Sequence, residues 1–126
     1  MIAIDSSTWI AYFSNQIAPD VEATQLAINQ HRATIPPLAL TELLSDPQLP
    51  TGIREIIKSI PLLPQRQGYW ERAGLLRSRL LKAKRKAKTA DTLIAQACID
   101  ANVALITRDR DYKNFVKFGK LRLALA

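Results

Sequence analysis

Three short apolar runs, each too short for a helix, alternate along the chain with longer segments whose apolar residues recur at helical spacing. The runs cover residues 1–4, 33–35 and 103–106, and each has the length and composition of a buried strand. Strands that alternate with helices predict an α/β fold, in which a parallel sheet is covered by helices on both faces. Because the chain shows no internal repeat or linker, we expect one domain over residues 1–126.

The clearest predicted helix covers residues 89–101. Its apolar residues, from Ala90 to Ala101, occupy positions i, i+3, i+4, i+7, i+8 and i+11 without a gap. We expect Thr89 to cap its N-terminus and Asn102 its C-terminus. The other predictions are helical segments at 9–13, 20–31, 38–44, 53–60 and 70–84, a frayed end or loop at 84–88, a polar loop at 107–111, a strand edge at 62–63 and a last strand at 121–125.

The composition is that of an ordinary globular protein. Hydrophobic residues make up 48% of the 126 residues and charged residues 23%, which argues against a disordered or collagenous chain. No apolar run approaches the roughly 18 residues that span a bilayer, and no basic segment precedes the first apolar run. A single Cys98 excludes an internal disulfide and two-cysteine metal motifs. We therefore expect a cytoplasmic protein without a membrane segment.

The positive charge is concentrated in the second half of the chain. Residues 1–63 carry three basic and six acidic residues, whereas residues 64–126 carry 15 basic and 5 acidic residues, for a net charge of +7 overall. Eight of the basic residues lie between Arg72 and Lys88. Such asymmetry is typical of proteins that contact a polyanion, most often nucleic acid. A solvated helix face is the alternative interpretation.

Four carboxylates stand at predicted strand ends or near helix starts. Asp5 and Asp109 follow apolar strands, Asp91 lies in the first turn of the helix at 89–101, and Glu42 lies on the helix after the second strand. Parallel strands bring such positions to one edge of a sheet, where α/β proteins bind ligands. Carboxylates held together repel one another unless a cation is present. A set of oxygen ligands without histidine or cysteine indicates Mg²⁺ or Mn²⁺.

Each of these residues also has a structural interpretation. Asp5 can serve only as a helix N-cap, and Asp91 can serve only to complement a helix dipole. Glu42 can be an exposed residue on an apolar helix, and Asp109 and Asp111 have the character of turn residues. It is the occurrence of all of them at strand ends and helix starts that favours a metal site.

Other residues of chemical interest favour structural roles. His31, the one histidine, has no serine or cysteine partner in an obvious catalytic arrangement. Cys98 lies on the apolar face of its helix and is predicted to be in the core. Trp9, Tyr12 and Phe13 can stack on bases, but packing in the core or a dimer interface is the favoured interpretation.

Four blocks of sequence resemble the PIN-domain family in order and spacing. They are DSSTWIAYF at residues 5–13, LTELL at 40–44, ADTLIA at 90–95 and LITRDRDY at 105–112. Within that family the chain is similar to the VapC-like toxin ribonucleases of toxin–antitoxin pairs, and the similarity covers residues 1 to about 125. The family has a three-layer α/β/α sandwich with a mainly parallel central sheet, which is the fold we expect here.

The resemblance implies a Mg²⁺- or Mn²⁺-dependent endoribonuclease. Its catalytic carboxylates would be Asp5, Glu42, Asp91 and Asp109, with the metal on Asp5, Asp91 and Asp109, and supporting roles for Ser6, Thr107 and Asp111. Tyr112 stands where the family more often has Phe, a departure expected to affect packing only. The basic residues predicted to hold the RNA backbone are Arg77, Lys84, Arg85, Lys86, Lys88, Arg108 and Arg110. Family resemblance also implies an antitoxin partner and a homodimer. The apolar groups at residues 9–13 and 53–60 are candidate contact surfaces.

Three other functions remain to be weighed against this one. A non-catalytic protein could bind nucleic acid or a partner and use the carboxylates structurally. A housekeeping RNA-processing nuclease would share the same site without an antitoxin. A phosphoacceptor receiver domain also gathers aspartates at strand ends, but it needs an acidic pair after the first strand and a lysine after a late strand. Here Asp5 stands alone and Thr107-Arg108 follows the late strand, which disfavours that fold.

Overall fold

The computed structural model describes residues 1–125, and its centre is a sheet of three parallel strands. Strand β1 (Ile2–Ile4) lies between β2 (Ala33–Thr34) and β3 (Ala104–Ile106). Ile2 is opposite Ala33 on one side and Ala104 on the other. The three apolar runs of the sequence therefore form the predicted parallel sheet, and the first run occupies the central position.

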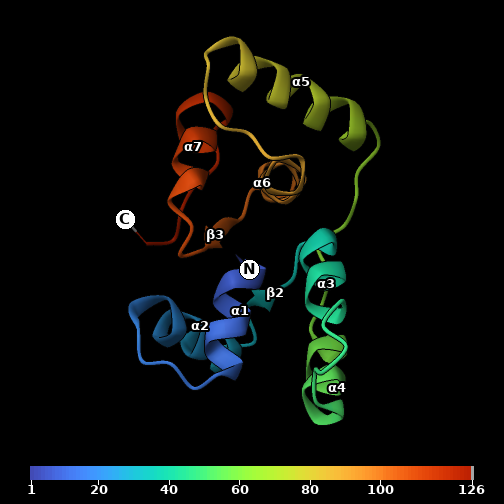
Figure 1. Ribbon diagram of the computed structural model, residues 1–126, viewed down its shortest axis with the longest axis vertical. Helices are drawn as coiled ribbons and strands as arrows, with labels where there is room; N and C mark the ends of the chain where they lie inside the picture. Colours follow the sequence, from blue (N-terminus) through green and yellow to red (C-terminus); the bar gives the residue numbers. More distant parts are fainter. Residues whose placement is uncertain (126) are drawn as a thin grey trace.

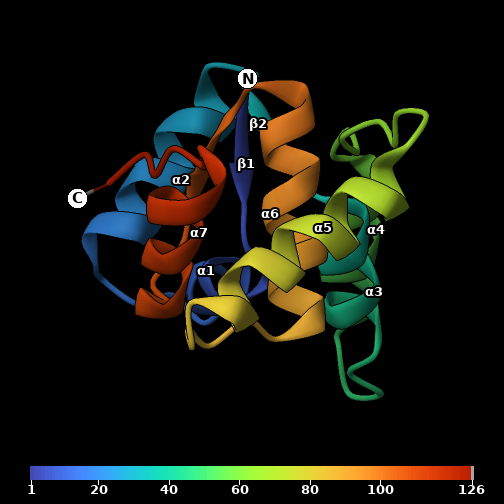
Figure 2. The same cartoon turned by 90° about the horizontal axis from the view of Figure 1, so that it is seen from above.

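Helices cover both faces of this sheet (Figures 1 and 2). They are α1 (Ser6–Phe13), α2 (Pro19–Asn29), α3 (Pro37–Leu44), α4 (Thr51–Ser59), α5 (Tyr69–Lys82), α6 (Thr89–Ala101), the 3₁₀ turn η1 (Arg110–Tyr112) and α7 (Lys113–Gly119). Helix α2 packs on β2 and β3 from one side and contacts α1, while α6 packs on β3 from the other side and contacts α5 and α7. Helix α3 contacts both α1 and α6 at the edge near β2, and α4 follows it (Figure 1). The arrangement is the expected three-layer α/β/α sandwich.

Buried side chains of the sheet and of α1, α5, α6 and α7 belong to one hydrophobic core. Trp9 is fully buried and stacks on Phe13 with ring centroids 5.7 Å apart, so Trp9 is a core residue rather than an exposed surface for bases. Cys98 is fully buried as predicted, and burial raises the pKa of its thiol. Tyr112 and Phe115 are also fully buried, which places the segment after β3 firmly against the core.

Three predictions about local structure are wrong. Residues 121–125 do not form a strand: Leu123 makes a single parallel bridge with Leu105. Thr89 is the first residue of α6 and not its cap, because Lys88 has the extended cap conformation and its carbonyl accepts a hydrogen bond from Thr92 Oγ1. The polar loop at 107–111 is shorter than expected and leads into η1 and α7, for which the sequence shows no long apolar period.

Several helix ends follow directly from the sequence. Asn102 ends α6 in the left-handed conformation, with φ of 54°, as expected of a C-cap asparagine. Proline occupies the first turn of α2 and α3, where its missing N–H costs nothing. Among the helices of residues 1–125, none combines the length and apolar character needed to cross a bilayer.

Candidate active site

The carboxyl ends of β1 and β3 meet at Asp5, as the parallel sheet predicted. Asp5 follows β1 and caps α1, and its Oδ1 accepts a hydrogen bond from the Ser6 amide at 2.9 Å. Its Oδ2 accepts from Ser7 Oγ and from Thr107 Oγ1, both at 2.9 Å. Burial raises the pKa of Asp5 although these hydrogen bonds act in the opposite direction. The cap and the predicted site residue are therefore the same carboxylate.

Three further carboxylates form a cluster beside Asp5. Asp91, Asp109 and Asp111 each offer one carboxylate oxygen, and these three oxygens lie within 4.8 Å of one another. Asp91 comes from the first turn of α6, and Asp109 caps η1 by accepting a hydrogen bond from the Asp111 amide at 2.9 Å. The structure thus groups Asp111, predicted as a supporting residue, with two predicted metal ligands.

The charges of this cluster destabilise one another. The pKa of Asp91 is raised to about 6, first by burial and then by repulsion from Asp109 and Asp5. A carboxylate in such surroundings is stabilised by any cation that binds next to it. The donor set consists of oxygens alone, so the residues present fit a hard divalent cation such as Mg²⁺ or Mn²⁺.

Glu42 approaches the cluster from α3 and remains exposed. Its Oε1 accepts a hydrogen bond from Ser6 Oγ at 3.0 Å, and the Ser6 amide donates to Asp5. Ser6, a predicted supporting residue, therefore links Glu42 to the buried carboxylate. The structure brings all four predicted carboxylates to one edge of the sheet.

Tyr112 belongs to this site, although the sequence suggested an effect on packing only. Its hydroxyl lies 3.4 Å from Oδ1 of Asp5 and 3.4 Å from Oδ1 of Asp91. Burial raises the pKa of the phenol, and the charges of Asp5 and Asp91 raise it further. The neutral hydroxyl has one proton to donate, and both carboxylates lie within its reach as acceptors. The departure from Phe at this position was the only signal in the sequence.

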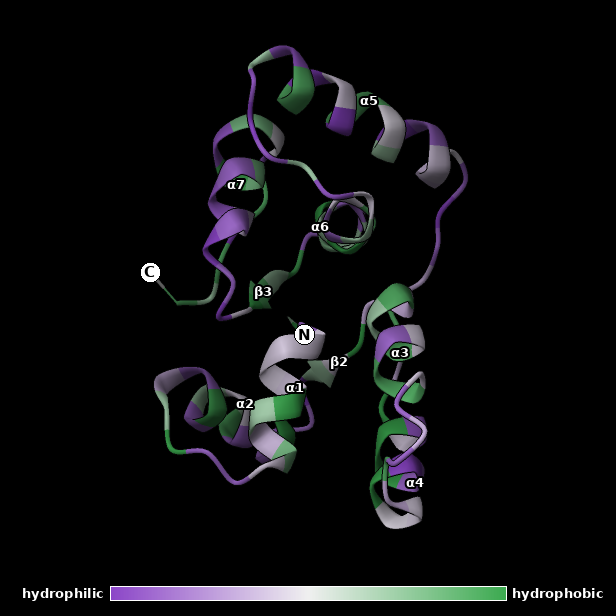
Figure 3. Ribbon diagram, viewed as in Figure 1, coloured by the Kyte–Doolittle hydropathy of each residue, from purple (hydrophilic) through white to green (hydrophobic). Residues whose placement is uncertain are grey.

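The predicted basic residues fall into two groups near the cluster. Lys84, Arg85, Lys86 and Lys88 are exposed on the segment between α5 and α6, which Figure 3 shows as strongly hydrophilic. Lys86 Nζ lies 3.1 Å from Asp111 Oδ2, so this segment reaches the carboxylates directly. Arg77 has a different role in the structure, because its Nε donates to the Ala87 carbonyl at 2.7 Å and holds the segment in place.

Arg108 and Arg110 lie on the other side, after β3. The Arg108 guanidinium donates to both carboxylate oxygens of Asp20, at 2.9 and 3.0 Å, and to Gln16. These bonds lower the pKa of Asp20, and they bind the loop after β3 to α2. Arg110 is exposed. Arg108 is therefore paired with Asp20, whereas Arg110 forms no ion pair with any residue among 1–125.

Comparisons with known proteins identify the fold and the family of this chain. A comparison with curated protein sequences finds no match. Among the solved structures with a similar fold are three of VapBC proteins. These are DNA-bound VapBC from Salmonella typhimurium (TM-score 0.72, 16% identity, covering 97% of this chain and 95% of that chain), DNA-bound VapBC2 from Rickettsia felis (0.73, 21%, 98% and 97%), and VapBC-5 of Mycobacterium tuberculosis, a member of the VapBC family of toxin–antitoxin systems (0.68, 20%, 96% and 94%).

The sequence itself matches one family model. The model is that of the PIN domain, and it covers residues 2–118, which include every carboxylate described above. The aligned region begins in β1 and ends in α7. The chain therefore belongs to the PIN domain family.

Proposed function

We propose that this protein is a metal-dependent endoribonuclease that hydrolyses RNA phosphodiester bonds. The observation that carries the proposal is the group of carboxylate oxygens from Asp91, Asp109 and Asp111, within 4.8 Å of one another and beside Asp5. Carboxylates this close together repel one another, and a bound divalent cation removes that repulsion. PIN-domain membership supports nuclease chemistry at this position.

The position of each residue in the site gives it a distinct role in the proposed reaction. Asp91, Asp109 and Asp111 would hold Mg²⁺ or Mn²⁺, and Asp5 would contribute from the buried side. When bound, the ion neutralises charge that develops on a phosphoryl oxygen and makes nearby water more acidic. Glu42, exposed and oriented by Ser6, accepts a proton from the attacking water. Thr107 and Tyr112 keep Asp5 and Asp91 oriented by donating hydrogen bonds.

The basic segment at 84–88 supports a polyanionic substrate. Lys86 pairs with Asp111, and the charge of Lys88 acts on Asp91. Positive charge at this place attracts the phosphate backbone and offsets repulsion between the acidic cluster and RNA. We assign Lys84, Arg85, Lys86 and Lys88 to this backbone contact.

We further propose that the protein is the toxin of a toxin–antitoxin pair and acts on cytoplasmic RNA as a homodimer. The support is the similarity to a chain of VapBC-5, a member of a toxin–antitoxin family. The α1 helix and α4 expose Ile10 and Ile56, which are candidates for protein contacts. A neighbouring gene for a small DNA-binding antitoxin would separate this role from housekeeping RNA processing.

The direct test is cleavage of RNA by the purified chain. We expect cleavage in Mg²⁺ or Mn²⁺, none in EDTA, and none by Asp91→Asn or Asp109→Asn. Asp46→Asn is the matched control, because Asp46 is exposed and its side chain bonds only the Gln48 amide. Loss of activity in Asp46→Asn as well, or persistence of cleavage in Asp91→Asn at the rate of the unaltered chain, contradicts the assignment.

A further inference from the structure

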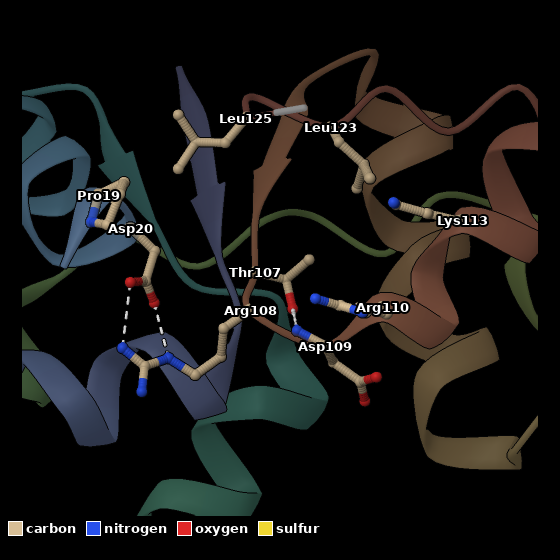
Figure 4. A pocket seen from close by; sticks show the side chains of 9 residues that line it. All are labelled: Pro19, Asp20, Thr107, Arg108, Asp109, Arg110, Lys113, Leu123 and Leu125. Atoms are coloured by element: carbon tan, nitrogen blue, oxygen red, sulfur yellow. Dashed lines mark hydrogen bonds and ion pairs between the residues drawn. The ribbon is translucent and has the colours of Figure 1, made fainter.

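A cavity of about 640 Å³ adjoins the carboxylate cluster at Asp109. Asp109 belongs both to the cluster and to the wall of this cavity. In Figure 4 its carboxylate points away from Leu123 and Leu125, while Arg110 and Lys113 lie on the same side of the cavity as Asp109. The cavity has the size of a site for a small molecule or a single nucleotide.

The walls of the cavity are of two kinds. Pro19, Leu123 and Leu125 supply apolar surface, and Arg110 and Lys113 supply positive charge. The Arg108 guanidinium also reaches the wall, but its charge is balanced by Asp20 through two hydrogen bonds. Arg110 and Lys113 form no ion pair with a residue among 1–125. Counting Asp109 as well, the side chains that line the cavity carry three positive and two negative charges, so the excess charge offered to a ligand is positive.

This combination matches one chemical class. A nucleotide presents a phosphate, which cations bind, and a ribose and base, whose faces pack on apolar side chains. A strand cut at the carboxylate cluster must leave it on two sides. The segment at 84–88 contacts the cluster at Asp111, and the cavity adjoins it at a different carboxylate, Asp109.

We propose that this cavity binds the nucleotide of single-stranded RNA adjacent to the phosphodiester that is cut. Arg110 and Lys113 bind its phosphate, and Pro19, Leu123 and Leu125 contact its ribose or base. Lys113 is a residue that the sequence did not single out. The inference rests on the proposed nuclease function, and it adds a specific subsite to it.

The test measures RNA binding in the full chain carrying Asp91→Asn, so that the probe is not cut. The probe is a fluorescein-labelled single-stranded RNA oligonucleotide, titrated at several salt concentrations in Mg²⁺. Adding Arg110→Ala or Lys113→Ala should weaken binding about threefold to tenfold near 0.1 M salt. Each change should also reduce the slope of log K against log salt by about 0.7, the value for one lost contact to a single strand.

Two further variants separate the cavity from general charge. Leu125→Ala should weaken binding with an unchanged salt slope, because an apolar contact releases no counterion. Lys117→Ala is the matched control: Lys117 lies on α7 with its Nζ 5.6 Å from the ring centroid of Phe118, and it does not line the cavity. Binding by this control should equal that of Asp91→Asn alone.

The outcomes distinguish the two proposals. Unchanged affinity and slope in both Arg110→Ala and Lys113→Ala overturn the subsite, while cleavage of RNA by the unaltered chain still supports the nuclease. Equal losses in Lys117→Ala also overturn the subsite, since they indicate contact with the whole basic surface. If the unaltered chain neither binds nor cuts RNA in Mg²⁺, the nuclease proposal fails and the subsite fails with it.

Discussion

The hydroxyl oxygen of Tyr112 lies 3.4 Å from Oδ1 of Asp5, although 107 positions separate the two residues in the chain. The same hydroxyl lies 3.4 Å from Oδ1 of Asp91. One neutral donor therefore stands between two buried or half-buried carboxylates. Without a cation, this donor reduces the repulsion between the carboxylates of Asp5 and Asp91. A divalent cation bound at the cluster would reduce the same repulsion.

Replacing Tyr112 by Phe should destabilise the metal-free protein by about 1–2 kcal/mol, because a hydrogen bond to a charged group is lost. The loss should shrink in excess Mg²⁺, since the cation then stabilises Asp5 and Asp91. Thermal unfolding in EDTA and in Mg²⁺ measures both effects. Tyr69→Phe is the control: it removes a hydrogen bond to the Leu93 carbonyl, and its cost should be the same with and without Mg²⁺. An equal cost of Tyr112→Phe under both conditions would show that the hydroxyl is only a packing feature.

Replacing Asp91 by Asn should have opposite effects on stability and activity. The pKa of Asp91 is raised to about 6 by burial and by repulsion from Asp109 and Asp5, so its ionised form is unfavourable near pH 8. We expect the metal-free variant to be more stable by about 1 kcal/mol, a value reduced for the solvent exposure of the site. Urea unfolding in EDTA measures this change. A variant that is less stable than the unaltered protein would contradict the repulsion.

The pair formed by Asp20 and Arg108 should make stability depend on acid pH. The hydrogen bonds from Arg108 lower the pKa of Asp20 from 3.8. The stabilisation is therefore complete above the ordinary value and is lost as the pH falls through the lowered one. Asp20→Asn should cost about 2 kcal/mol at pH 7, and this cost should vanish well below pH 3.8. Urea unfolding at pH 7, 5, 3 and 2 is the measurement, and the cost should fall only as the pH drops through the lowered pKa of Asp20.

Two glycines should respond in opposite directions to alanine. A Cβ at Gly119 would lie 2.7 Å from Leu76 Cδ1, a fully buried side chain, so Gly119→Ala should destabilise the protein by about 1–3 kcal/mol. Gly74 lies within α5 with nothing within 4 Å of its Cβ position, so Gly74→Ala should stabilise it by about 1 kcal/mol. Thermal unfolding of the two variants checks the packing of α7 on α5. A neutral Gly119→Ala would mean that this contact is loose.

The parts of the fold that the sequence predicted are those with a strong local pattern. The six apolar positions of α6 and the short runs that became β1 and β3 needed no long-range information. Helix α7 was missed because its seven residues are shorter than two helical turns of apolar period, and its position depends on Phe115 packing in the core. The strand predicted at 121–125 does not form, because its pairing with the sheet is a single bridge between Leu123 and Leu105.

The same division applies to the candidate site. The meeting of Asp5 and Asp109 at one edge of the sheet followed from the rule that parallel strands end at one edge, whereas Thr107 came only from the family resemblance. The grouping of Asp111 with Asp91 and Asp109 depended on the η1 turn, which the sequence did not predict. The pairing of Arg108 with Asp20 was equally inaccessible, because it joins residues 88 positions apart. Contacts that depend on tertiary structure leave no spacing signal in one sequence.

The central position of β1 has a consequence for synthesis of the chain on the ribosome. Asp5 emerges early, but its partners Thr107 and Tyr112 are separated from it by 102 and 107 positions. Until β3 has left the exit tunnel, β1 has no strand on that side and Asp5 has neither partner. A nascent chain therefore cannot assemble the proposed centre until the segment that carries Thr107 and Tyr112 has left the tunnel.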